Sequence, residues 1–231
     1  MKRILIVARK ELKELFSERN TLLFALAMTL FFSIIYSFGA MRENDGAGSM
    51  GGVVLFLSSA IGVFMAYMLT GRIFFREKTE RVIETLMCAP IGIRELWAGK
   101  ALSVTGLAWG LTLLGTIVMF TITSFLPGDI PAASLLIAYV LLVVPVLIFA
   151  FVGLLGFAQF FLGMRENRII SMLIFIPLFG ALYGVGYGIG GSIIISWTII
   201  LIILGFSLFL VLVASFVLRY LSKERVVRTL S

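Results

Sequence analysis

Residues 133–163 read ASLLIAYVLLVVPVLIFAFVGLLGFAQFFLG, an uninterrupted stretch without a single Asp, Glu, Lys or Arg. A helix needs about 20 apolar residues to cross the roughly 30 Å hydrocarbon core of a bilayer, so this stretch is long enough to do so. Five other uncharged runs of similar length accompany it, at roughly 21–41, 51–71, 101–126, 169–189 and 193–218. The sequence therefore predicts an all-α, polytopic membrane protein with six transmembrane helices.

The overall composition excludes several classes of function. Of the 231 residues, 61% are hydrophobic and 13% are charged, whereas soluble domains carry about 25% charged residues. The chain has no histidine and a single cysteine, Cys88. Catalytic triads, Cys-His nucleophiles, HExxH zinc sites and an intrachain disulfide are therefore excluded. We expect that the chain is not an enzyme, that it has no catalytic residue and no metal site, and that it binds no cofactor itself.

The distribution of positive charge predicts the orientation. Eighteen of the nineteen Lys and Arg residues lie in 1–20, 72–100, 164–168 or 219–231, and Arg42 alone lies on the other side. Because Lys and Arg concentrate in cytoplasmic loops, both termini and the 72–100 segment are predicted to face the cytoplasm of a cell membrane. We expect two parts, an interfacial helix over 1–20 and a single transmembrane domain over 21–231.

The N-terminal stretch is amphipathic. Apolar residues recur at helical spacing on one side, with Lys, Arg and Glu on the other; these apolar residues are Ile4, Val7, Ala8, Leu12, Leu15 and Phe16. Such a helix is predicted to lie in the membrane interface with its apolar face in lipid. Glu11, Glu14 and Glu18 do not favour lipid binding, so a second interpretation is that this helix also belongs to a docking surface.

Segment 72–100 is a dense charged segment, with six basic and four acidic side chains. This mixture of signs argues against nucleic acid as a partner. Its Gly99-Lys100 ending is not a phosphate-binding loop, because Arg94 replaces the first glycine of that motif and Ala101 replaces its hydroxyl residue. The pattern predicts a helix that continues from the second span, a break at Pro90 and Gly92, and a second short helix whose Trp97 lies at the headgroup level.

Glycines gather near the end of the fifth run, in the sequence GVGYG at 184–188. A potassium-channel filter resembles this pattern, but the flanking threonine and aspartate of the filter are missing here. Close helix packing through small residues and a re-entrant segment that lines a cavity are the other interpretations. The candidate pathway residues are Tyr183, Gly184, Gly186, Tyr187, Gly188 and, from the fourth run, Gln159.

Two motifs carry a resemblance to a known family. The stretch EKTERVIETLMCAPIGIRELWAGK (77–100) resembles the signature of ABC-2 type transporter permeases, and ARKELKELFSERNTLL (8–23) resembles the elbow helix that opens that family. Val82 and Ile83 depart from the family, which usually has Gly-Thr there. The family also has the six spans and the cytoplasmic termini that are predicted here.

The resemblance implies the transmembrane subunit of an ATP-binding cassette exporter. Two permease chains, expected as a homodimer, would form the path across the bilayer, and a separate ABC ATPase subunit would use ATP and Mg. The residues that match the coupling motif are Glu77, Glu80, Arg81, Glu84, Pro90, Arg94, Glu95 and Lys100, and those of the elbow helix are Lys10, Glu11 and Glu14. An ion channel or ion-coupled carrier, and a membrane scaffold that recruits an ATPase, are the alternatives.

Overall fold

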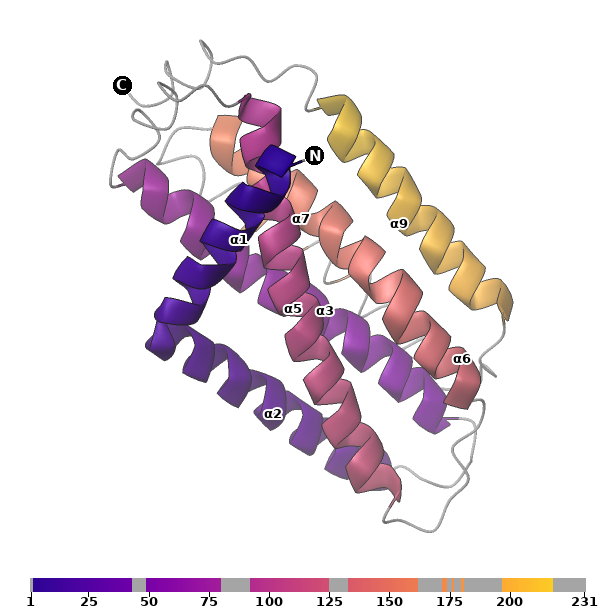
Figure 1. Ribbon diagram of the computed structural model, residues 1–231. Helices are drawn as coiled ribbons and strands as arrows, with labels where there is room; N and C mark the ends of the chain where they lie inside the picture. Colours follow the sequence, from indigo (N-terminus) through magenta and orange to yellow (C-terminus); the bar gives the residue numbers. More distant parts are fainter. Residues whose placement is uncertain are drawn as a thin grey trace.

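The computed structural model describes residues 2–42, 49–79, 92–124, 133–161 and 197–217, together with residues 172, 173, 176 and 180. Helices make up nearly all of these residues, and no strand occurs among them. The elements are α1 (Lys2–Ser17), α2 (Arg19–Arg42), α3 (Ser49–Thr79), α5 (Ile93–Ser124), α6 (Ala133–Ala138), the π-helical turn η1 (Tyr139–Val143), α7 (Val144–Phe161) and α9 (Trp197–Val217). Figure 1 shows them as a helical bundle.

Several of these helices meet the requirement for crossing a bilayer. In the described part of the chain, four spans are long and apolar enough, and the bent pair α1 and α2 would make a fifth. This confirms the all-α class and the presence of several membrane-length helices. The expected fifth span, 169–189, lies almost entirely outside the described residues, so the number six remains a prediction.

The order of packing distinguishes central helices from peripheral ones. α5 packs against α1, α2, α3 and α7, while α9 packs mainly against α7. In the most apolar stretch of α3, 72% of the residues are buried inside the protein, but in that of α9 only 17% are. α3 and α5 therefore lie at the centre of the bundle, and α9 presents most of its apolar surface outward, as a lipid-facing helix would.

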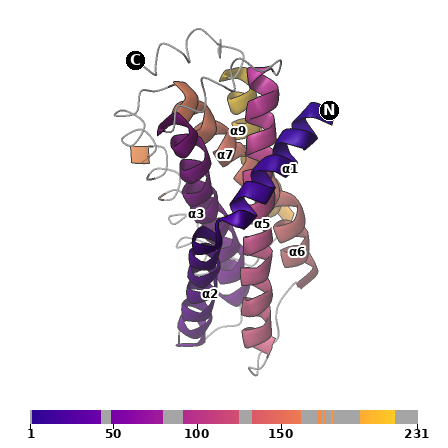
Figure 2. The same ribbon diagram turned by 60° about the vertical axis from the view of Figure 1, so that its left-hand side comes forward.

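α1 and α2 meet at a sharp bend. Their axes differ by 82°, and Figure 2 shows α1 crossing the bundle while α2 runs along it. Glu18 separates the two helices: its carbonyl accepts the amides of Thr21 at 3.1 Å and Leu22 at 3.2 Å, in the first turn of α2. Its carboxylate also accepts the Thr21 hydroxyl at 3.1 Å. Glu18 thus caps α2 at the bend, while the interfacial position of α1 remains a prediction.

α2 packs on α5 through small side chains at a strict four-residue spacing. This buried stripe consists of Thr21, Ala25, Thr29, Ser33 and Ser37. Its partner on α5 is Gly115, where an added Cβ would lie 2.8 Å from Ser33 Oγ and 2.9 Å from Thr29 Cγ2. Because a glycine faces this stripe, the two backbones approach more closely than larger residues would permit.

A π-helical turn interrupts the fourth span directly before Pro145. The Val144 amide donates to the Tyr139 carbonyl, five residues earlier. In the same pattern the Val140 carbonyl would need the amide of Pro145, which has no N–H. Trp109 of α5 supplies the missing donor, since its indole Nε1 lies 3.1 Å from the Val140 oxygen. The Tyr139 hydroxyl, fully buried, shares a hydrogen bond with Ser59 of α3.

We predict that Trp109→Phe destabilises the protein because it leaves the Val140 carbonyl without a donor. The expected loss is about 1–3 kcal/mol of unfolding free energy, measured by denaturant titration in mixed micelles. In a Pro145→Ala background the new amide can serve the Val140 carbonyl, so the same substitution should have a smaller effect there. Equal losses in both backgrounds would show that the indole hydrogen bond does not compensate for the proline.

Candidate coupling site at the crossing of α1 and α5

The first turn of α5 is held by its own side chains. The Gly92 amide donates to Glu95 Oε2 at 3.2 Å, and the Leu96 amide donates to the Gly92 carbonyl at 3.0 Å. This is the glutamate half of a capping box, in which the third helical residue returns to the residue before the helix. Glu95, predicted as a docking residue, therefore also fixes where α5 begins.

The expected separate short helix over IRELWAGK is wrong. These residues are the first two turns of α5, which continues without a break to Ser124. Lys100 and Ala101 are consecutive residues of this helix. Leu96 and Ala101 are both buried in the bundle. Apolar contacts on both sides of Lys100 thus carry the helix through the point at which the sequence changes from charged to apolar.

Trp97 does not face outward as a membrane anchor would. Its side chain is buried, at 6% exposure, and its ring meets that of Phe149 edge to face, with the ring centroids 6.3 Å apart. A Cβ added at Gly153 would lie 3.3 Å from Trp97 Cζ2. The absence of a side chain at Gly153 therefore makes room for the indole, which packs between α5 and α7 and not against headgroups.

Gly99 is the point at which α1 crosses α5. A Cβ added at Gly99 would lie 2.7 Å from both Cβ and Cγ1 of Val7 and 3.0 Å from the Ile4 carbonyl oxygen. Real Cβ atoms essentially never approach other atoms so closely. The glycine of the Gly99-Lys100 pair therefore permits helix contact.

Lys100 lies beside this crossing and is paired with Glu11 of α1. Its Nζ is 3.0 Å from Glu11 Oε1, and the two side chains are 0% and 4% exposed. Lys10 adds a longer contact to Glu11 at 3.6 Å. Two charges removed from water are stable only when they compensate each other, so this buried pair fixes the position of α1 on α5.

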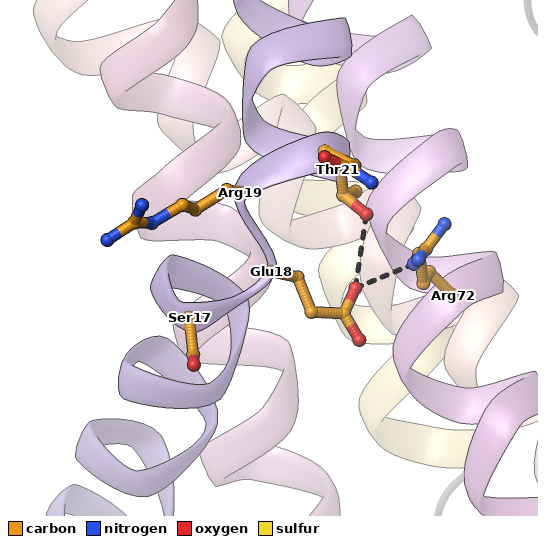
Figure 3. A pocket seen from close by; sticks show the side chains of 6 residues that line it. Ser17, Glu18, Arg19, Thr21 and Arg72 are labelled. Atoms are coloured by element: carbon orange, nitrogen blue, oxygen red, sulfur yellow. Dashed lines mark hydrogen bonds and ion pairs between the residues drawn. The ribbon is translucent and has the colours of Figure 1, made fainter.

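A second ion pair joins the bend between α1 and α2 to α3. Arg72 Nε lies 2.7 Å from Glu18 Oε2, and Figure 3 shows the Glu18 carboxylate between Thr21 and Arg72, with Ser17 and Arg19 directed away from it. These residues and Asn20 line an open hollow of about 460 Å³. Residues from α1, α2, α3 and α5 are thus tied together at one end of the bundle, which we call the α1 end.

The predicted site residues fall into three groups. Arg94, Lys10 and Glu14 are exposed at the α1 end, Glu95 is half-buried, and Glu11 and Lys100 are buried. Gln159 is also buried, in the last turn of α7. The remaining predicted residues lie outside the described residues, apart from Glu77, which belongs to α3 but whose side chain is not described. They are Glu80, Arg81, Glu84, Pro90, Tyr183, Gly184, Gly186, Tyr187 and Gly188.

The contacts between side chains inside this site could not be predicted from the sequence. Gly99 was recognised only as part of a motif, and the pairing of Arg72 with Glu18 left no local pattern, because 54 residues separate them. Within the described ranges, no group of three or more potential metal ligands occurs. No protein-family model, curated protein or solved structure matches the chain significantly.

Proposed function

We propose that the chain is the permease subunit of an ABC-2 type transporter in the cytoplasmic membrane, with both termini in the cytoplasm. Two copies form the translocation path, and a separate ATPase docks on the 72–100 segment and drives export by hydrolysing ATP with Mg. The chain itself is not an enzyme in this proposal. Support comes from residues 77–100, which resemble the family signature, and from the excess of Lys and Arg on the predicted cytoplasmic side. The several membrane-length helices add to it.

One observation carries the proposal most directly, namely the continuity of α5. This helix begins at Ile93, within the charged segment, and reaches Ser124 without an interruption. A displacement of its first turn therefore passes along a helix of about 48 Å, at 1.5 Å per residue. Gly99 and the Glu11–Lys100 pair attach α1 to the same helix, so α1 and α5 would move together when a docked ATPase changes shape.

Exposed charges near this end offer the surface for such a partner. Lys10 and Glu14 lie on the outer side of α1, and Arg94 lies in the first turn of α5. Together with the predicted Glu77, Glu80, Arg81 and Glu84, they present charges of both signs, which suits a specific protein partner better than a uniform lipid surface.

Glu84→Arg is predicted to abolish docking. The test coexpresses the chain with a candidate Walker-motif ATPase of the same genome and measures copurification and ATP hydrolysis in liposomes. We expect loss of both for Glu84→Arg and retention of both for Glu43→Arg, a matched charge reversal on the opposite side of the membrane. Unchanged copurification of Glu84→Arg would refute the docking role.

Transport is distinguished from scaffolding by an ATP-dependent movement of the spans. Cys88→Ser removes the native thiol, and a spin label at the exposed Leu208 of α9 reports the distance between two copies. The proposal expects that this distance changes when a hydrolysis-deficient ATPase binds ATP. A stable complex whose label distance does not respond to ATP would favour a scaffold, and ATP-independent ion flux through the chain alone would favour a channel.

A further inference from the structure

The acidic residues of the N-terminal segment are already neutralised within the protein. Glu11 pairs with Lys100 at 3.0 Å, Glu14 with Lys10 at 3.8 Å, and Glu18 with Arg72 at 2.7 Å. Each carboxylate thus has a base of its own chain beside it. These three glutamates therefore oppose the binding of negatively charged lipids less than the sequence suggests, because bases of the same chain compensate their charge.

Three bases of the same segment remain uncompensated. Arg9, Lys13 and Arg19 are all exposed, and none of them forms a hydrogen bond or ion pair with the part of the chain that the structure describes. Arg9 and Lys13 are four residues apart, so they lie on one side of α1. Arg19 follows at the bend, where Figure 3 shows its guanidinium extending away from the Glu18–Arg72 pair.

Exposed apolar side chains lie next to these bases. Leu5 precedes Arg9 by four residues, Phe16 follows Lys13 by three, and Leu23 lies one turn after Arg19; their exposures are 61%, 57% and 65%. The structure buries Val7, Ala8 and Leu15 against α5, so the lipid contact expected of the whole apolar face falls to these outer residues. Bases beside insertable apolar side chains are typical of helices that bind anionic membrane surfaces.

The hollow at the bend adds a binding feature that a flat helix surface lacks. It has a volume of about 460 Å³ and is open to the surroundings, so a headgroup at the membrane surface could enter it directly. Ser17, Asn20 and Thr21 contribute polar side chains to its wall, and Arg19 contributes a cation. Glu18 and Arg72 also line it, but they are paired with each other. The first amides of α2, those of Arg19 and Asn20, precede the first paired amide at Thr21, so α2 also begins with its positive dipole end here.

We propose that the bend between α1 and α2 binds the headgroup of an anionic phospholipid of the membrane. The phosphate contacts Arg19 at the hollow, Arg9 and Lys13 contact neighbouring anionic headgroups, and Leu5, Phe16 and Leu23 contact acyl chains. A base near an anionic lipid surface contributes about a fivefold factor in affinity. This inference does not depend on an ATPase partner, so its failure would leave the proposed function untouched.

The test uses the full chain in nanodiscs of phosphatidylcholine with increasing fractions of phosphatidylglycerol. Native mass spectrometry counts the retained phosphatidylglycerol molecules, and the unfolding temperature is followed in parallel. We expect that the unmodified chain retains phosphatidylglycerol in preference to phosphatidylcholine. Lys13→Gln and Arg19→Gln should each weaken this retention about fivefold. Their unfolding temperatures in pure phosphatidylcholine should not change, which shows that both variants fold.

The double variant Lys10→Gln with Glu14→Gln is the control. It removes an exposed ion pair of the same helix without leaving an uncompensated carboxylate, so phosphatidylglycerol retention should stay within twofold. An equal loss for this double variant and for Lys13→Gln would show that any change to the polar side of α1 weakens retention, and would overturn the site. Equal retention of the two lipids would overturn it as well. Inorganic phosphate raising the unfolding temperature as strongly as the lipid would assign the hollow to a soluble anion instead.

Discussion

Lys100→Met is expected to lower the free energy of unfolding by about 3–5 kcal/mol, because it leaves the Glu11 carboxylate buried without its partner. The methionine side chain fills a similar volume, so a cavity does not explain the loss. Lys10 lies 3.6 Å from Glu11, but it is an exposed side chain and compensates a buried charge only weakly. The measurement is denaturant-induced unfolding of the purified chain in mixed micelles, followed by tryptophan fluorescence.

A double substitution separates the buried charge from the packing. Glu11→Leu combined with Lys100→Met removes both charges and should recover most of the stability, since apolar pairs often replace buried ion pairs at little loss. Lys10→Met, at an exposed ion pair of the same helix, should change stability by about 0–1 kcal/mol. If the double variant is as unstable as Lys100→Met alone, the ion pair does not hold α1 on α5.

Gly99→Ala is the second substitution with a large expected effect. An alanine normally stabilises a helix relative to glycine by about 0.5–1 kcal/mol, but here its Cβ would overlap Val7 and press on the backbone of Ile4. Overpacking of this kind costs about 1–3 kcal/mol, and we expect α1 to separate from α5. Trypsin cleavage at the exposed Arg9 and Lys13 of α1 should be slow in the parent chain and faster in Gly99→Ala.

Gly106 provides the control for this substitution on the same helix. No atom lies within 4 Å of a Cβ added there, so Gly106→Ala should leave the trypsin cleavage of α1 unchanged and stabilise α5 slightly. If Gly99→Ala and Gly106→Ala behaved alike, the close crossing at Gly99 would not limit how α1 is placed. Under the proposed function, the chain should still stimulate ATP hydrolysis by its ATPase partner when it carries Gly106→Ala. It should lose this stimulation with Gly99→Ala if α1 and α5 move together.

The length of the runs without charged residues made the membrane-length helices predictable. The helix boundaries depend on contacts that the local sequence does not reveal. The run 133–163 predicted a span, and α6, η1 and α7 cover most of it. Pro145 lies within this run and lacks an N–H, but the π-helical form also needs the indole of Trp109, 31 residues before Val140, to satisfy the Val140 carbonyl. The charged run likewise ended at Lys100, whereas α5 began at Ile93.

The candidate site was predicted as a set of residues but not as an arrangement. The resemblance of two contiguous motifs to a known family identified Glu11, Glu95 and Lys100. It could not show that Lys100 is buried, since that depends on a carboxylate of the distant α1. A charged side chain at the end of a charged segment has the same local pattern whether it faces a partner protein or another helix of its own chain.

The pairing of Glu11 with Lys100 also has a consequence for the order in which the protein is made. Glu11 leaves the ribosome about ninety residues before Lys100, a delay of roughly 5–20 s at about 5–20 residues per second. During that time α1 has no partner on α5, and its carboxylate remains hydrated. α1 can reach its final place only after α2, α3 and the start of α5 have been synthesised, so α1 is made before the helix that holds it.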